Sequence, residues 1–465
     1  MSKHWTPNED QARGVKMMLN QAAVGLFADP GVGKTSISLA AFKVLKNQGI
    51  AKKMLVVAPL FPAYNSWPGE IAKWAEFNEL TYTIIHDKKG ETKEQALEKD
   101  VDIYLINYEG LLWLLPDPSP KARPRDRHTR HLRWDWDVLC ADEGTALKDS
   151  QTNRFKRLRC IVGNFRRRWL LTGTPIPNGY QDLFGQMYVL DGGGALGAFI
   201  THFRTSYMIK SFNGFSYDMR PGAIEEIEEK IAPFILRLEA THDHELVPLY
   251  TDVYLSPELR EQYNELEREF YLALEQGEIV ASNSAVVGGK LRQFANGAIY
   301  ATDECDERYW IPIHDLKIQA LQSILNELNG SPALVFYEFQ SDRERILARW
   351  PKTPVIGGGM SGEESARIIA DFNAGKIPML LAHPASGSKG LNLQELSNRV
   401  IWFGMTWNLE WYLQGNARVS RQGQKQEYVY VHHIRCVGTR DERVIEVINN
   451  KDLTQKELLQ ALATR

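Results

Sequence analysis

The sequence has few cysteines, no excess of one charge and no long apolar run. Its four cysteines show neither a CxxC spacing nor the density of a disulfide scaffold, which favours a reducing compartment. The 55 Lys and Arg residues nearly balance the 58 Asp and Glu residues, giving a formal net charge of −3 and excluding a uniformly basic nucleic-acid coat. No apolar run approaches the roughly 20 residues that cross a bilayer, and no apolar signal segment begins the chain. We therefore expect a cytoplasmic protein with no membrane partner.

Length and composition predict a folded chain with more than one core. The 465 residues correspond to about three units at roughly 150 residues per domain. Hydrophobic residues make up 43% and charged residues 24%, both close to globular averages, and we find no tandem repeat or long low-complexity tract. Nearly all of the chain is therefore expected to be structured.

Short apolar segments alternate with longer amphipathic stretches in two parts of the chain, a pattern typical of βα units on a parallel sheet. The first set of predicted strands is Ala23–Ala28, Lys53–Ala58, Ile103–Asn107, Val138–Ala141 and Arg168–Thr172. The second set is Ala333–Tyr337, Met379–Ala382, Val400–Phe403 and Tyr428–His432. The fold class we predict is α/β, with two lobes that each contain a parallel sheet.

Between the two sets the sequence changes to acidic helical stretches, such as Ile224–Ile231 and Pro257–Glu278. We therefore expect a first lobe over residues 1–180, helical insertions and the connection between lobes over 181–311, and a second lobe over 312–465. Ligands of parallel α/β sheets bind at the carboxyl ends of the strands, so residues that directly follow the predicted strands are the first candidates for a site.

The segment Ala28-Asp-Pro-Gly-Val-Gly-Lys-Thr35 follows a predicted strand and precedes a helical pattern. Gly31 and Gly33 allow backbone N–H groups to turn toward phosphate oxygens at a helix N-terminus. Lys34 supplies a positive charge for the β and γ phosphates of ATP, and the Thr35 hydroxyl is a candidate magnesium ligand. The alternative is an ordinary glycine-rich turn before a helix.

Two adjacent carboxylates, Asp142 and Glu143, end another apolar strand. A buried carboxylate needs a compensating cation, and phosphoanhydride hydrolysis needs both a magnesium ligand and a group that orients and deprotonates water. We predict the first role for Asp142 and the second for Glu143. An Asp-Glu pair alone could equally be a helix cap, but Lys34 upstream favours the catalytic interpretation.

Two stretches are rich in basic residues. Pro116–Arg133 reads as a loop, either solvated or in contact with phosphates. From Arg154 to Arg168 seven basic residues occur without an acid, and Arg166, Arg167 and Arg168 are our candidates for DNA binding. Because charge runs are usually solvated helix faces, that alternative stays open.

The acidic pair also lies in an ordered series of motifs. Asp142–Asp149 and Leu171–Asn178 resemble motifs II and III of the Swi/Snf-related branch of helicase superfamily 2. In order along the chain, further segments resemble motifs Ia, Ib, the end of the first lobe's insertion, IV, V and VI: Pro59–Trp74, Ile106–Leu111, Pro233–Arg237, Leu334–Phe339, Ser386–Leu393 and Gln414–Gln424. The resemblance spans about Gln11 to Glu446 and is to a minimal bacterial or phage-type member.

This resemblance implies two RecA-like lobes that bind ATP with magnesium and act on double-stranded DNA. It assigns adenine recognition to Gln11, nucleotide contact to Gly390, and DNA or nucleotide contact to Lys389. It makes Arg418 and Arg421 arginine fingers on the γ-phosphate, worth about 10³–10⁵ in rate.

Thr172 and Thr174 would couple the nucleotide site to DNA. Taken singly, each is equally well explained as a turn-forming hydroxyl after a strand. The sequence departs from the family pattern at Pro30, Thr145, Leu238, Ser388 and Asp10, whereas the catalytic pair is intact.

Three functions fit these residues. The first is an ATP-dependent translocase on duplex DNA that does not separate the strands. The second is a strand-separating helicase acting on single-stranded or branched DNA in recombination, repair or replication, which needs a wedge. One position for a wedge is between motifs V and VI, but only 21 positions separate Leu393 from Gln414, which leaves little room. The loop Pro116–Arg133 is the other candidate for the wedge.

The third function is a scaffold that keeps the fold without the chemistry, which the intact Lys34, Asp142 and Glu143 oppose. We expect a monomer in a bacterial or phage-infected cell, with room for a separate protein partner that directs it.

Overall fold

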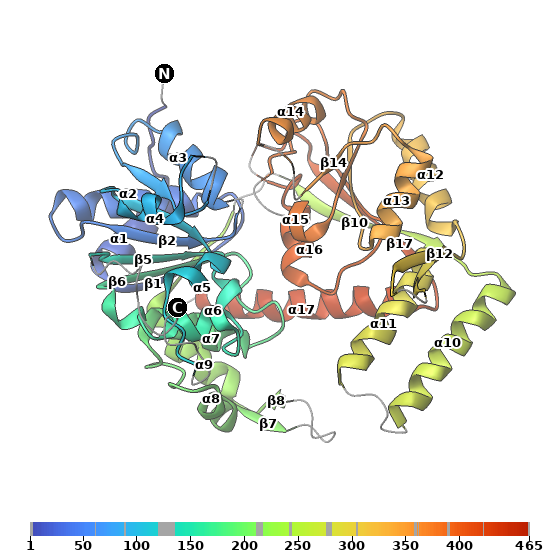
Figure 1. Ribbon diagram of the computed structural model, residues 1–465, viewed down its shortest axis with the longest axis horizontal. Helices are drawn as coiled ribbons and strands as arrows, with labels where there is room; N and C mark the ends of the chain where they lie inside the picture. The colour runs from blue at the N-terminus through green and yellow to red at the C-terminus, as the bar shows by residue number, and fades with distance from the viewer. Residues whose placement is uncertain are drawn as a thin grey trace. The chain divides into compact units, whose positions relative to one another are not determined.

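The computed structural model describes residues 3–60, 62–87, 90–119, 135–210, 217–240, 244–275, 281–303, 306–357, 360, 362–387, 391–421 and 423–463. These residues form two compact units (Figure 1). Unit 1 consists of residues 1–240 and 451–465, and unit 2 consists of residues 241–450.

Unit 1 is built on a parallel sheet of seven strands in the order β3-β4-β2-β5-β6-β1-β9. The strands are β1 Ala23–Ala28, β2 Met54–Ala58, β3 Tyr82–Ile84, β4 Ile103–Asn107, β5 Val138–Asp142, β6 Arg167–Thr172 and β9 Ile235–Leu238. A short antiparallel pair, β7 Met208–Lys210 and β8 Tyr217–Met219, lies outside this sheet.

Helices cover both faces of the unit 1 sheet. They are α1 Glu9–Asn20, α2 Lys34–Asn47, α3 Trp67–Lys73, α4 Lys93–Glu98, α5 Leu111–Leu114, α6 Asn153–Arg159, α7 Asp182–Asp191, α8 Ile200–Tyr207 and α9 Ala223–Ile231. Shorter helical turns are Pro62–Ser66, Tyr108–Gly110, Gly144–Leu147, Val162–Asn164 and Ala232–Phe234.

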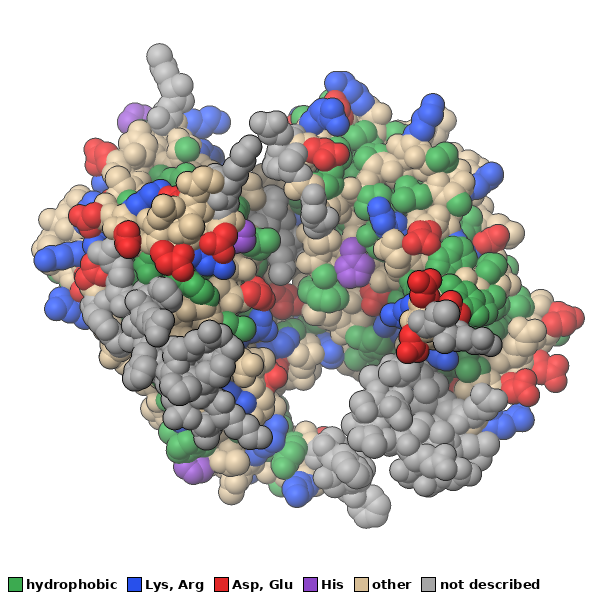
Figure 2. All heavy atoms as spheres, viewed as in Figure 1, with side chains coloured by type: hydrophobic (Ala, Val, Ile, Leu, Met, Phe, Trp, Pro, Cys, Tyr) green, Lys and Arg blue, Asp and Glu red, His purple; other side chains and the backbone are tan. Residues whose placement is uncertain are grey.

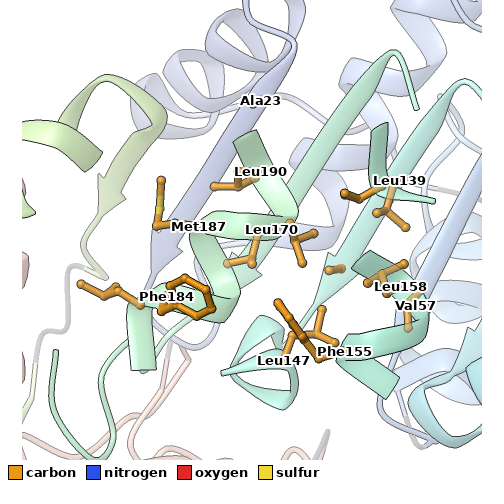
Figure 3. Close-up of a cluster of buried hydrophobic side chains, with 14 of the residues drawn as sticks. Ala23, Val57, Leu139, Leu147, Phe155, Leu158, Leu170, Phe184, Met187 and Leu190 are labelled. Carbon is orange, nitrogen blue, oxygen red and sulfur yellow. The ribbon is translucent and has the colours of Figure 1, made fainter. Parts of the chain in front are cut away.

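Alternate residues of each strand enter two different cores, because successive side chains of a strand point to opposite faces. On one face, Leu139 and Leu170 of the sheet pack against Phe155 of α6 and Phe184 of α7 (Figure 3). On the other face, Cys140 and neighbouring strand residues pack against α1, α2 and α3. Burial on both faces explains why these strands read as continuous apolar runs in the sequence.

Unit 2 contains a parallel sheet of six strands in the order β10-β17-β16-β13-β15-β14. The strands are β10 Glu245–Val253, β13 Ala333–Phe336, β14 Val355–Ile356, β15 Met379–Ala382, β16 Arg399–Trp402 and β17 Tyr428–Cys436. An antiparallel pair, β11 Ala298–Thr302 and β12 Arg308–Pro312, precedes β13 in the chain.

The helices that begin in unit 2 are α10 Pro257–Glu275, α11 Ala281–Asn296, α12 Leu316–Leu328, α13 Gln340–Arg349, α14 Gly362–Asn373, α15 Pro384–Gly387, α16 Leu409–Asn416 and α17 Arg440–Ala463. The last turns of α17 belong to unit 1, where Leu458, Leu459 and Leu462 join the core that contains α6 and α7.

The predicted α/β class with two parallel sheets is confirmed, and each predicted strand is present with its ends shifted by at most a few residues. Units 1 and 2 have other boundaries than the three predicted segments. Residues 181–240 belong to unit 1 because β9 pairs with β1, and residues 241–311 belong to unit 2 because β10 pairs with β17.

The segment expected to contain helical insertions also contains β7 to β12. These strands are short, lie at sheet edges or are largely exposed, so they lack the apolar runs that marked the central strands.

Candidate nucleotide site

The sheet order of unit 1 brings three predicted motifs together. Strands β5, β6 and β1 are neighbours, and all are parallel. The phosphate-binding loop follows β1, the acidic pair ends β5, and Thr172 ends β6. The candidate residues therefore line one edge of the sheet, at the carboxyl ends of the strands, where ligands of such sheets bind.

The phosphate-binding loop has the backbone conformation that its glycines predict. Gly31 and Gly33 have φ values of 90° and 93°, which side chains rarely tolerate, and α2 begins directly afterwards at Lys34. Lys34 Nζ donates to the carbonyl oxygens of Ala28 at 2.8 Å and Asp29 at 3.4 Å. The loop, its lysine and the N-terminus of a 14-residue helix thus form a cradle suited to phosphate.

Two neighbouring elements hold this loop. A Cβ atom at Gly173, after β6, would lie 3.2 Å from the Ala28 carbonyl oxygen, so glycine permits close approach of the two loops. On the other side, Arg237 of β9 forms an ion pair with Asp29, with 2.6 Å between Nη2 and Oδ1. Arg237 Nη1 also donates to the Phe27 carbonyl oxygen at 3.1 Å.

Asp142 is 6% exposed, and its two carboxylate oxygens have different donors. The indole Nε1 of Trp67 donates to Oδ2 at 2.9 Å, and the backbone N–H of Glu143 donates to Oδ1 at 3.1 Å. Burial, together with the nearby Glu143 charge, raises the pKa of Asp142 to about 6, against the opposing effects of the Trp67 hydrogen bond and the Lys34 charge. A cation would relieve this cost, so the carboxylate and the Thr35 hydroxyl fit a magnesium ion by ligand chemistry.

Glu143 adopts a left-handed conformation with φ 51° and ψ 57°, which is uncommon for a residue with a side chain. The next residue, Gly144, has no room for a side chain, because a Cβ atom there would lie 2.5 Å from Leu170 Cγ. The Tyr108 hydroxyl donates to the Asp142 carbonyl oxygen at 2.8 Å and contacts that of Glu143 at 3.4 Å. A strained conformation held from outside is frequent at functional sites.

Gln11 lies against the phosphate-binding loop. Its Nε2 donates to the Val32 carbonyl oxygen at 2.9 Å, and its Oε1 accepts from the Asn8 backbone N–H at 3.1 Å. Both ends of the carboxamide are thus engaged at the start of α1. The placement fits a residue near the nucleotide, and adenine recognition by Gln11 stays a prediction.

The two threonines predicted to couple the site lie at the end of β6. The Thr172 hydroxyl accepts from the Thr174 backbone N–H at 3.1 Å, and both side chains are buried. Within the described residues, Thr174 Oγ1 is buried without a hydrogen-bond partner. The local turn predicted as the alternative role is therefore present.

In unit 2, Arg418 and Arg421 converge on one backbone carbonyl. The Nη1 atoms of both donate to the Leu391 carbonyl oxygen at 3.3 Å, and Arg418 Nε donates to the Gln414 carbonyl oxygen at 2.8 Å. These contacts join motif VI to the end of motif V. Gly390 and Lys389 lie outside the described residues.

The residues of the basic run 154–168 make different contacts. Arg167 Nη1 donates to the carbonyl oxygens of Met18 and Gln21 at 2.8 and 2.9 Å, closing the C-terminus of α1. The Arg168 side chain is half-buried. The Arg166 side chain is 75% exposed, and its Nε lies 3.5 Å from Asp137 Oδ1.

Arg167 and Arg168 pair with the first residues of β5 and β1, so they lie at the sheet edge opposite to the nucleotide loops. On the face seen in Figure 2, the described Lys and Arg side chains are scattered among Asp and Glu side chains. A DNA role for these arginines stays a prediction, and the solvated-face alternative stays open. Most of the predicted loop Pro116–Arg133 lies outside the described residues.

No individual role was predicted for Trp67, Glu70, Tyr108 or Arg237, although all four occur in segments that resemble parts of the family pattern. All four contact the loop, the helix after it or the acidic pair. The motif resemblance was the signal that could have found them.

A glycine-rich phosphate cradle, a buried aspartate and a following glutamate at one edge of a parallel sheet define a nucleotide-hydrolysing site of the phosphate-loop class. Residues 10–298 match the SNF2-related domain, and residues 316–423 match the helicase conserved C-terminal domain. The chain belongs to the SNF2-related family, and it is an ATP hydrolase of the helicase-like type.

Similar proteins occur in phages, bacteria and plants. Protein p41 of Acyrthosiphon pisum secondary endosymbiont phage 1 is 33% identical over 99% of both chains. YwqA of Bacillus subtilis, named as an ATP-dependent helicase/translocase, is 22% identical over 96% of this chain and 48% of its own length. The CHD3-type chromatin-remodeling factor PICKLE of Arabidopsis thaliana is 26% identical over 96% of this chain and 33% of its own length.

Among solved structures, the Sulfolobus solfataricus SWI2/SNF2 ATPase core in complex with dsDNA is 24% identical, covers 99% of this chain and 94% of its own, and has a TM-score of 0.44. The described helices include none with the length and apolar character of a membrane span.

Proposed function

We propose that this ATPase depends on DNA and translocates along double-stranded DNA. The observation that carries the proposal is the meeting of Lys34, Thr35, Asp142 and Glu143 at one sheet edge, within a chain whose family includes proteins named for helicase, translocase and chromatin-remodeling activity.

The residues divide the chemistry among them. Backbone N–H groups of the loop and Lys34 would hold the β and γ phosphates, and Thr35 and Asp142 would hold magnesium. Magnesium bound there would neutralise charge on the phosphate oxygens during hydrolysis. Glu143 orients the attacking water and accepts its proton.

Arg418 and Arg421 would act from unit 2 as arginine fingers when the units close on ATP. Their present bonds to the Leu391 carbonyl oxygen would then be exchanged for bonds to phosphate oxygens. Hydrolysis would release this contact, so that one cycle of closing and opening advances the protein along the DNA backbone.

Strand separation is the second candidate. The segment between motifs V and VI, at residues 394–413, contains β16 and the start of α16 and no hairpin. Because this segment has no hairpin that could serve as a wedge, it favours translocation without strand separation.

The test is steady-state ATP hydrolysis without nucleic acid and with single-stranded DNA, blunt duplex DNA or RNA, using Lys34→Ala as the inactive control. We expect the strongest stimulation with blunt duplex. Stimulation mainly by single strands or forks would favour the helicase, and hydrolysis indifferent to every nucleic acid would contradict DNA dependence.

A further inference from the structure

Two buried aromatic side chains reach the acidic pair from neighbouring parts of unit 1. Trp67 begins α3, after β2, and is 0% exposed. Tyr108 follows β4 directly and is 2% exposed. Each donates its single polar hydrogen to the Asp142–Glu143 segment, although neither belongs to the phosphate loop or to motif II.

Trp67 fixes the direction of the Asp142 carboxylate. Its bond to Oδ2 and the Glu143 N–H bond to Oδ1 together determine the plane of the carboxylate group. A carboxylate bonded at both oxygens is held in one orientation, which is the role that outer hydrogen bonds have around metal ligands.

The helix that carries Trp67 is also tied to the phosphate-loop helix. Glu70 Oε2 accepts from the Ser36 hydroxyl at 2.6 Å and from Trp74 Nε1 at 2.6 Å. Ser36 directly follows Thr35 in α2. One short helix, α3, thus sets the positions of both predicted magnesium-binding segments.

Tyr108 fixes the backbone on either side of the turn to Glu143. Its hydroxyl lies 2.8 Å from the Asp142 carbonyl oxygen and 3.4 Å from that of Glu143. Residues with a side chain rarely adopt the left-handed conformation of Glu143, so it persists only where its surroundings hold it. Asn107 steadies Tyr108 in turn, because its Oδ1 accepts from the Gly110 backbone N–H at 3.1 Å.

These bonds are more than the packing of large side chains requires. Trp169, on β6, is also 0% exposed, and its Nε1 is buried without a hydrogen-bond partner in the described residues. The core of unit 1 thus accepts a tryptophan for its ring alone. The directed bond of Trp67 to a carboxylate indicates a different task.

We propose that Trp67 and Tyr108 are positioning residues for ATP hydrolysis. Trp67 aims the Asp142 carboxylate at the metal that accompanies ATP, and Tyr108 holds the turn that aims Glu143 at the attacking water. The proposal rests on the roles proposed above for Asp142 and Glu143, and it predicts different defects for the two side chains.

Trp67→Phe replaces the indole with a smaller aromatic ring and removes the N–H donor. We expect the magnesium concentration for half-maximal hydrolysis to rise about 10-fold or more, the usual range for loss of an outer partner of a metal ligand. Binding of a fluorescent ATP analogue in EDTA should stay within about 2-fold of wild type, whereas the gain in affinity on adding magnesium should shrink. The matched control is Trp169→Phe, which removes a buried indole with no bond to the site.

Tyr108→Phe removes one oxygen atom. We expect kcat to fall about 10-fold while the affinity for the magnesium–nucleotide analogue stays within about 2-fold. The control is Tyr104→Phe on β4, the strand that precedes Tyr108; the Tyr104 hydroxyl donates to the Lys99 carbonyl oxygen away from the site. Since this change is minimal, it keeps the proposal testable if Trp67→Phe does not fold.

Equal magnesium dependence of Trp67→Phe and Trp169→Phe, or equal kcat of Tyr108→Phe and Tyr104→Phe, would overturn the proposal for the residue concerned. Glu143→Gln, measured in parallel, separates this failure from a failure of the proposed chemistry. A Glu143→Gln protein with wild-type turnover removes Glu143 from its role and overturns the Tyr108 proposal with it. An enzyme that depends on Glu143 but not on Trp67 or Tyr108 contradicts only the positioning.

Discussion

The two units use buried polar groups in different ways. In unit 1 the buried Asp142 lies at the ligand edge of the sheet, among residues of the nucleotide site. In unit 2, Lys317 is 0% exposed and binds Asp441 at 2.6 Å and Asn296 Oδ1 at 2.7 Å. Asn296 in turn donates to Asp342 at 2.8 Å.

This network joins α11, α12, α13 and α17 and lies among structural helices. A buried charge thus lies in the candidate nucleotide site in one unit, and buried charges connect helices in the other. The difference lies in placement: Asp142 ends a strand at the candidate ligand edge of a parallel sheet, whereas Asp342 and Asp441 lie in the first turns of helices.

The largest expected effect tests whether unit 2, besides its structural network, contributes a catalytic side chain. Arg421→Ala should lower kcat by about 10³–10⁵, because the charge that stabilises the transferred phosphoryl group is lost. Binding of the nucleotide analogue by the isolated variant, measured by fluorescence titration, should be unchanged. Arg443→Ala is the control, since Arg443 is exposed and pairs locally with Glu446. Lost nucleotide binding would instead indicate a structural role for Arg421.

The next effect belongs to unit 1. Glu143→Gln should lower kcat about 10²–10⁴, the contribution typical of a general base, while nucleotide binding is retained. Single-turnover hydrolysis measures the chemical step directly. Glu94→Gln, in the first turn of α4, is the matched control. Wild-type turnover by Glu143→Gln would assign the proton transfer to another group.

Acid should distinguish the stabilities of the two units. Burial lowers the pKa of His314, His432 and His433 in unit 2 to about 4. Because these values lie below the ordinary 6.5, the unfolded state takes up protons first, so this contribution is full above pH 6.5 and is lost as the pH falls toward 4. Asp342, whose pKa burial raises to about 6, opposes this trend and gains stability as the pH falls through 6.

Three histidines outweigh one aspartate, so unit 2 should lose on the order of 1–3 kcal/mol between pH 6.5 and 5. In unit 1, burial raises the pKa of Asp142 to about 6, which favours stability as the pH falls. Pulse proteolysis in urea with mass-spectrometric assignment of peptides would follow each unit. His433→Gln should reduce the acid loss, and His202→Gln, in α8 of unit 1, should not; a larger acid loss in unit 1 would contradict the comparison.

The smallest effect concerns the basic run. Arg166→Glu tests it without breaking the Arg167 bonds to the end of α1. If Arg166 contacts a DNA phosphate, as predicted, the salt slope of duplex-DNA binding, measured by fluorescence anisotropy, should fall by about 0.9. An unchanged slope would favour the solvated-face alternative for Arg166.

The central strands and the phosphate loop could be predicted because local sequence determines them. Strands such as β1 are apolar on both faces, and the glycines of the loop have the conformations that only glycine favours. Neighbouring strands then bring the loop and the acidic pair together. The candidate site in unit 1 followed from this local information and the parallel topology.

The rest depended on contacts between distant segments. Arg167 read as part of a charged patch, yet its guanidinium closes α1, almost 150 positions earlier in the chain. Edge strand β10 is mostly exposed and gave no apolar run, and its pairing with β17 is visible only in the folded sheet. The bond between Trp67 and Asp142 joins motifs Ia and II, and no spacing rule reports it.

The most direct test of the central claim is displacement of a third strand from a blunt duplex that carries a triplex. We predict that the wild-type protein with ATP displaces the third strand without separating the duplex, and that Lys34→Ala does not. ATP hydrolysis stimulated by duplex DNA without displacement of the third strand would contradict translocation.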